Sequence, residues 1–169
     1  MDKVATGAKM DSVKPKQTSR YIVVAIGLAI AFLLWSSNIF AGSPPTNIGV
    51  NNGKLAACPT SPNCVSSQIP ASDTQHAIAA LSFSGDLPTS MAKLTQVIQA
   101  MPRTKIVKQN NNYLYAEFSS SLMKFVDDVE FYLDDGTKTI QVRSASRLGD
   151  SDLGVNRQRV EEIRSKLAS

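Results

Sequence analysis

The chain has 169 residues, a formal net charge of +4 and a sequence pI near 9.1. This length fits one compact domain with accessory segments. The charge is uneven, because residues 1–41 hold five of the 18 basic residues and two of the 14 acidic ones, which leaves 13 bases and 12 acids for residues 42–169. A nearly neutral domain has no composition typical of polyanion binding, so we expect no nucleic-acid partner.

The N-terminus has the pattern of an export segment. A basic tail, residues 1–20, precedes an uncharged apolar run that begins at Tyr21. Crossing a bilayer takes about 20 apolar residues, and the run reaches that length only if it extends to Ala41. A shorter signal-peptide core with cleavage after Ala41 is the alternative. Residues 21–41 are therefore predicted to be a signal anchor or a signal peptide.

Both alternatives place residues 42–169 outside the cytoplasm, because a basic tail stays on the cytoplasmic side. The protein is then membrane-anchored or secreted, for example into a periplasm. Its expected membrane contact is the N-terminal segment. Residues 42–54 are rich in Gly, Pro and Asn and predict a linker, followed by a single domain over residues 55–169.

The two cysteines, Cys58 and Cys64, predict a disulfide in such a compartment. Zinc needs about four ligands, and the only histidine, His76, is expected at the surface or at a sheet edge. A redox dithiol is more typically Cys-x-x-Cys. No cofactor or metal is expected.

Four predicted segments follow along the chain. Residues 75–83 predict a first strand. Asp86 begins a helix that ends near Met101, because Pro102 follows. Alternating residues on each side of three asparagines predict a hairpin from residues 105–109 and 113–119.

A second hairpin and a last helix complete the domain. Strands at residues 125–133 and 138–144 flank Asp135-Gly136, which favours a two-residue type I′ turn. Residues 156–167 predict a helix. The fold class is α+β: an antiparallel sheet of about four or five strands, with two helices packed on one face.

The two-residue turn fixes a strand register. It places Phe131 opposite Ile140 and Asp128 opposite Arg143, so apolar side chains face each other and an acid faces an arginine. Asp127 then points to the apolar face, where a carboxylate needs partners. We expect these to be Arg147 and the amides of the following loop.

Three motifs stand out. They are Cys-Pro-Thr-Ser-Pro-Asn-Cys-Val-Ser-Ser at 58–67, Phe-Val-Asp-Asp-Val-Glu-Phe at 125–131, and the Arg/Asp/Ser-rich stretch 143–160. Together they resemble domain of unknown function 1499, a family of bacteria and photosynthetic eukaryotes, over about residues 55–167. The resemblance implies an exported or membrane-associated domain with no established reaction, and it adds the thylakoid lumen to the candidate compartments. It implies these motif residues: Asp127, Asp128, Glu130, Arg143, Ser144, Ser146, Arg147, Ser151, Asp152, Asn156, Arg157 and Arg159.

These residues divide into two predicted groups. A structural acid–arginine network comprises Asp127, Asp128, Glu130 and Arg143. Ligand or partner binding is assigned to the loop and helix start, with Arg147, Arg157 or both facing a site. The full set is Arg147, Arg157, Arg159, Asp152 and Asn156.

The favoured function is a non-catalytic binding or assembly module, tethered outside the cytoplasm at a membrane. It would bind an anionic group or a membrane-protein partner. The alternative is a hydrolase-like enzyme in which Asp127 or Asp128 acts with a serine of the 144–151 stretch. No histidine base, serine elbow or metal cluster supports that alternative.

Overall fold

The computed structural model describes residues 17–36 and 40–169. Most of the predicted basic tail and part of the proposed cleavage site lie outside the described residues. The chain divides into two compact units, with the boundary after Ser37. In the first unit α1 (Gln17–Ser36) forms one helix, and its side chains from Tyr21 to Phe32 are exposed. None of the helices in the described parts of the chain combines the length and apolar character that crossing a bilayer requires.

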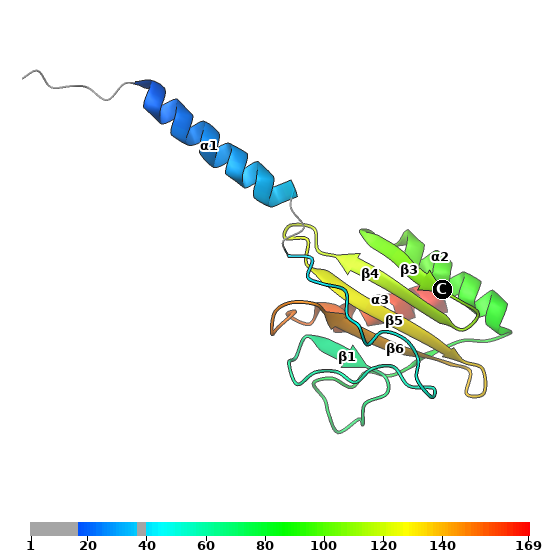
Figure 1. Cartoon of the computed structure of the whole chain (residues 1–169). Coiled ribbons are helices and arrows are strands. Elements are labelled where there is room, and N and C mark those ends of the chain that lie inside the picture. The colour runs from blue at the N-terminus through cyan, green and yellow to red at the C-terminus, as the bar shows by residue number, and fades with distance from the viewer. Residues whose placement is uncertain (1–16, 37–39) are drawn as a thin grey trace, which may run out of the picture. The chain divides into compact units, whose positions relative to one another are not determined.

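The second unit is α+β and contains a six-stranded antiparallel sheet (Figure 1). The strand order is β1-β6-β5-β4-β3. The short β2 stands outside this order and pairs with residues 139–140 of β6, whereas β1 pairs with residues 143–145. The elements are β1 (Cys64–Ser66), β2 (Leu81–Ser82), α2 (Leu87–Ala100), β3 (Thr104–Gln109), β4 (Tyr113–Ser119), β5 (Val126–Asp134), β6 (Thr139–Ser146) and α3 (Val155–Ala168).

Helix α2 begins as its sequence predicts. The Asp86 side chain accepts a hydrogen bond from the Thr89 amide at 2.8 Å, and a proline occupies the first turn. Met91, Leu94 and Ile98 recur at helical spacing and are buried against the sheet. This pattern gives the helix one apolar face.

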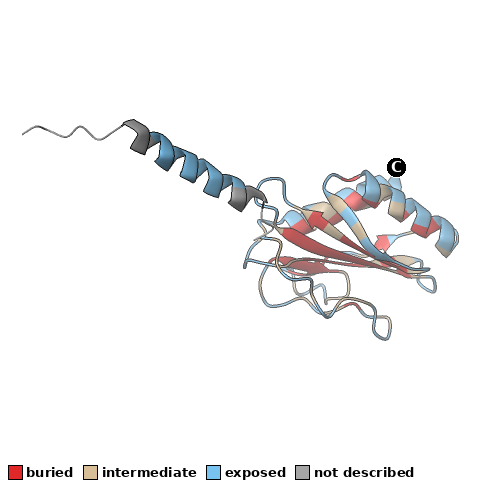
Figure 2. Ribbon diagram, turned by 45° about the horizontal axis from the view of Figure 1, so that its top comes forward, coloured by how far each residue is buried: buried red, intermediate tan, exposed pale blue. Residues whose placement is uncertain are grey.

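The main core lies between the two helices and one face of the sheet, called the helix face below. Alternate residues of β4, β5 and β6 point into it, and Figure 2 shows buried residues along these central strands. Leu114, Val129 and Phe131 are fully buried there. From α3, Val160 and Ile163 complete the core.

The opposite face of the sheet, called the outer face, is also covered. Residues 42–57, named the strap below, run across it (Figure 1). Leu55 packs against Tyr113 and Tyr115, and the Gly49 amide donates to Glu130 Oε1 at 2.7 Å. Most of this segment was expected to be a linker on composition, but Ile48 and Leu55 give it apolar contacts with the sheet.

The predicted register of the β5–β6 hairpin is wrong by two residues. Phe131 pairs with Val142, and Arg143 pairs with Glu130 rather than with Asp128. The cause is a longer turn: Asp134 pairs with Thr139, so four residues, 135–138, connect the strands instead of two. In this turn Lys138 adopts a left-handed backbone conformation (φ 52°), and Gly136 does not. A two-residue shift preserves the side of the sheet on which each side chain lies, so the predicted faces survive.

Other details also differ from the sequence predictions. Of the predicted 75–83 strand only Leu81–Ser82 forms a strand, and β1 was not predicted. His76 is buried rather than exposed, because its ring lies between Asp73 Oδ2 (2.8 Å) and the Ser61 carbonyl (3.2 Å). The predicted disulfide between Cys58 and Cys64 is present.

Candidate functional site: the loop end of the sheet

One end of the sheet collects the loops that carry most of the motif residues. It comprises residues 101–103, 119–125 and 147–155 together with Phe40, and is called the loop end (Figure 1). The rings of Phe40 and Phe125 lie 5.3 Å apart. The Arg147 amide donates to the Val126 carbonyl at 3.0 Å. Chain segments distant in sequence are therefore fixed beside one another here.

Arg147 holds the start of the 147–155 loop to the outer face. Its Nε donates to Asp128 Oδ2 at 2.9 Å and its Nη2 to Asp128 Oδ1 at 2.7 Å. Glu117 and the Tyr115 hydroxyl are further partners. The Arg147 side chain is only 6% exposed. The Asp128 carboxylate raises the guanidinium pKa further above its usual value, and burial raises the pKa of the Tyr115 hydroxyl.

Arg159 performs the equivalent role on the helix face. Its Nη2 donates to Asp127 Oδ2, and its Nη1 donates to Ser144 Oγ at 3.0 Å and to Asn156 Oδ1 at 2.6 Å. The guanidinium also lies 4.8 Å from the centre of the Phe118 ring. Neighbouring aspartates on β5 thus pair with two arginines on opposite faces of the sheet.

Asn156 and Asp152 connect α3 to this network. Asn156 is fully buried and donates to the Asn63 carbonyl at 3.0 Å. Asp152 accepts from the Gly154 amide at 3.0 Å and the Asn156 amide at 2.7 Å. Asp152 therefore satisfies amides at the start of α3, as a capping carboxylate does.

Arg157 bonds to main-chain carbonyls rather than to an acid. Its guanidinium donates to Ala77 at 2.9 Å and to Gln75 at 3.1 Å. These bonds fix the segment before β2 to α3. Of the predicted binding residues, Arg147, Arg157 and Arg159 are all engaged with the chain itself.

Glu130 and Arg143 form the least satisfied pair on the outer face. Glu130 is fully buried, and its Oε1 accepts from the Tyr113 hydroxyl and the Gly49 amide at 2.7 Å each. Its Oε2 lies 3.6 Å from Arg143 Nη1, beyond hydrogen-bond distance. Neither Glu130 Oε2 nor Arg143 Nε has a hydrogen-bond partner within the described structure.

The arginine partners of Asp127 and Asp128 therefore differ from those predicted. Asp128 bonds to Arg147 rather than Arg143, and Asp127 bonds to Arg159 rather than Arg147. The register shift explains the first difference, because Asp128 pairs with Ala145, and Arg147, two residues along, projects from the same face.

The residues of the enzyme alternative are also placed. Ser146 Oγ donates to Asp127 Oδ1, while Ser144 Oγ donates to Asn156. Both Asp127 oxygens are thus already bonded. Residues 17–36 and 40–169 contain no group of three or more His, Cys, Asp or Glu side chains arranged to hold a metal ion.

The braced loops expose apolar side chains. In residues 40–169, eight large apolar residues are more than one third exposed, and six of them belong to the loop end. They are Phe40 (37%), Leu122 (68%), Met123 (44%), Leu148 (41%), Leu153 (90%) and Val155 (44%). Sequence reasoning missed them; apolar residues inside otherwise polar loops were the available signal.

Backbone conformations at the loop end are also unusual. Five described residues other than glycine have positive φ, and three lie here: Arg103 (57°), Lys124 (60°) and Leu153 (54°). A left-handed leucine is costly, of order 1 kcal/mol or more. The fold sustains this conformation where the side chain is almost fully exposed.

Comparison with known proteins matches residues 54–167 to a family model described as "Protein of unknown function (DUF1499)". The match covers more than half of the chain and includes every network residue described above. A search of curated proteins found no match.

Proposed function

The chain belongs to the DUF1499 family of proteins of unknown function, and we propose that it is an exported, non-catalytic binding module whose loop end rests on a membrane surface. One observation carries the proposal: six exposed apolar side chains gather on an end held rigid by buried ion pairs. Exposed apolar patches on soluble domains commonly mark interaction surfaces.

Two exposed cations at the loop end, Arg103 and Lys124, suit an anionic lipid surface. One exposed acid, Asp150, lies in the same set of loops. Arg103 uses its Nε on the Ser119 carbonyl at 3.1 Å, and its terminal nitrogens have no bonded partner among the described residues. A basic residue near an anionic lipid surface contributes about 1 kcal/mol. Apolar side chains would enter the headgroup boundary while these two cations meet phosphates.

The position of the loop end in the chain favours lipid over a protein partner. The predicted signal anchor or signal peptide, residues 21–41, includes Phe40, and Phe40 contacts Phe125 at the loop end. In this proposal a lipid surface receives the predicted segment, and Phe40 belongs to both that segment and the loop end.

Export is supported by two independent features. The N-terminal sequence combines a basic tail with an apolar run. The Cys58–Cys64 disulfide is typical of an oxidising compartment, such as a periplasm or thylakoid lumen.

In this proposal the motif arginines bind no ligand. Arg147 and Arg159 hold the loop in position, and phosphate groups meet Arg103 and Lys124 instead. The acid–arginine motif is then the framework that presents Leu148, Leu153 and neighbouring side chains.

A nitroxide label tests the proposal. Both native cysteines are disulfide-bonded, so a single added cysteine can be labelled selectively. Leu153→Cys in the full chain, reconstituted in vesicles that contain anionic lipid, should be protected from a water-soluble relaxation agent and accessible to lipid-dissolved oxygen.

Val107→Cys is the matched control, because Val107 is an exposed apolar residue (45%) on β3. Its label should remain fully accessible from water. Equal water accessibility at both positions would show that the loop end does not enter the lipid. Protection of Leu153 from both agents would instead indicate a protein interface and refute the lipid assignment.

A further inference from the structure

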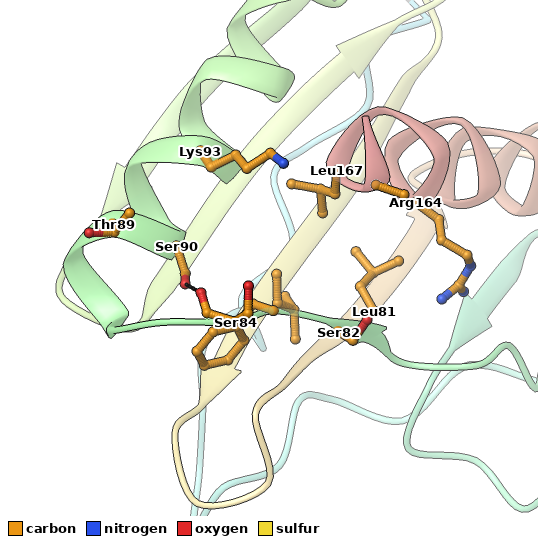
Figure 3. Close-up of a pocket in the computed structure, with 11 residues that line it drawn as sticks. Leu81, Ser82, Ser84, Thr89, Ser90, Lys93, Arg164 and Leu167 are labelled. Carbon is orange, nitrogen blue, oxygen red and sulfur yellow. Dashed lines mark hydrogen bonds between the residues drawn. The ribbon is translucent and has the colours of Figure 1, made fainter.

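A hollow lies at the opposite end of the sheet from the loop end, near the β5–β6 turn. It has a volume of about 340 Å³ and is bounded by β2 with the residues after it, the first turns of α2 and the end of α3 (Figure 3). Small-molecule sites commonly have volumes of about 300–1,000 Å³. None of its lining residues belongs to the loop end or to the acid–arginine network.

The inner wall of this hollow is apolar. Leu81 and Ile140 are each only 1% exposed and form its base, where β2 pairs with β6. Phe83 and Leu167 are partly buried and form its sides. A ligand body over these four residues meets apolar side chains, while hydroxyl groups of Ser82, Ser84, Thr89 and Ser90 complete the lining.

The opening is positively charged. Lys93 and Arg164 line it, and the lining includes no aspartate or glutamate. Arg164 is committed to the chain, since it donates to the Ala80 carbonyl at 2.8 Å, to the Ala79 carbonyl at 2.7 Å and to Glu161. Lys93 has no hydrogen bond or ion pair within the described structure, and Figure 3 shows its side chain extending across the opening towards Leu167.

We propose that this hollow binds a small amphiphilic anion: an apolar body enters over Leu81 and Ile140, and a carboxylate or similar head group pairs with Lys93. A free ammonium group above an apolar base matches both ends of such a molecule. A cationic amphiphile would meet Lys93 and Arg164 without an opposing carboxylate.

Octanoate is a suitable probe because it is small and soluble. Methyl NMR spectra of the full chain should show saturable shifts at Leu81, Ile140 and Leu167. Octylammonium should produce none, and 1-octanol should bind more weakly than octanoate. Hexanoate should bind roughly ten- to twentyfold more weakly than octanoate, because two methylene groups leave the pocket.

Two variants separate charge from shape. Lys93→Gln should weaken octanoate binding about two- to fivefold, the range for an exposed ion pair, and leave 1-octanol binding unchanged. Lys108 is an exposed lysine on β3 outside the hollow, so Lys108→Gln is the matched control and should leave the binding of octanoate and of 1-octanol unchanged. Ala168→Trp should fill the hollow and abolish the binding of both molecules.

Three results would overturn the proposal: no shifts at the three methyl-bearing residues, equal binding of octanoate and octylammonium, or octanoate binding that Lys93→Gln leaves unaltered. An unchanged melting temperature for Lys93→Gln confirms that a loss of binding reflects the site rather than the fold.

Discussion

Arg147→Gln should destabilise the domain like a core mutation. The change removes both bonds from the guanidinium to Asp128, which is 2% exposed, and leaves that carboxylate with the Tyr115 hydroxyl as its remaining partner. Breaking a buried ion pair by removing one partner costs about 3–5 kcal/mol. Domains of this kind have total stabilities of about 5–15 kcal/mol, so a large fraction would be lost.

The assay is urea unfolding of the full chain followed by circular dichroism, with the midpoint compared at equal slope. Asp128→Asn should be similarly harmful. The double variant should cost less than the sum of the single changes, with a coupling of about 0.5–3 kcal/mol, because neither charge is then buried alone.

Glu162→Gln is the control, since it breaks an ion pair with Lys166 whose side chains are 52% and 46% exposed. That change should cost less than about 1 kcal/mol. If Arg147→Gln costs no more than this control, or if the double variant is additive, the pair does not hold the loop. Arg147 would then be available to bind a ligand or partner, as the sequence predicts.

Two further predictions concern other parts of the domain. Protein purified without reductant from its own compartment should contain no free thiol, and Cys58→Ser should destabilise it by about 2–3 kcal/mol for so short a loop; two freely alkylated thiols would contradict this. The hydrogen bond that the His76 ring donates to the Asp73 carboxylate raises the pKa of His76. Protonated His76 therefore stabilises the fold below the unfolded pKa of about 6.5, and this contribution is lost as pH rises through the higher folded pKa. Between the unfolded and the folded pKa of His76, the melting temperature of the native protein should fall as pH rises, and that of Asp73→Asn should change less. Identical dependence of the melting temperature on pH in the two proteins would refute a stabilising role of the His76–Asp73 pair.

The regular elements were predictable where local signals agree. The start of α2 combined a capping aspartate, a proline and helical spacing, and the structure confirms it. The β3–β4 hairpin followed from alternation on each side of three asparagines, and it is also confirmed. In both cases the decisive interactions join residues close in sequence.

The acid–arginine partners were not predictable in the same way. They depend on the length of the β5–β6 turn, and Asp135-Gly136 alone does not determine whether two or four residues form it. A left-handed Lys138 decides the register, and lysine carries no sequence signal for that conformation. The partner of Asp127, Arg159, comes from α3, whose packing depends on the whole core.

The strap has a consequence for where the folding unit begins. The family match starts at residue 54, yet Gly49 supplies a hydrogen bond to the fully buried Glu130, and Gly42 lies so close to Leu148 that a side chain there would approach its Cγ to 3.1 Å. A fragment cut at the family boundary would uncover a carboxylate that the native chain keeps from water. The segment matched by the family is thus shorter than the segment needed to cover both faces of the sheet.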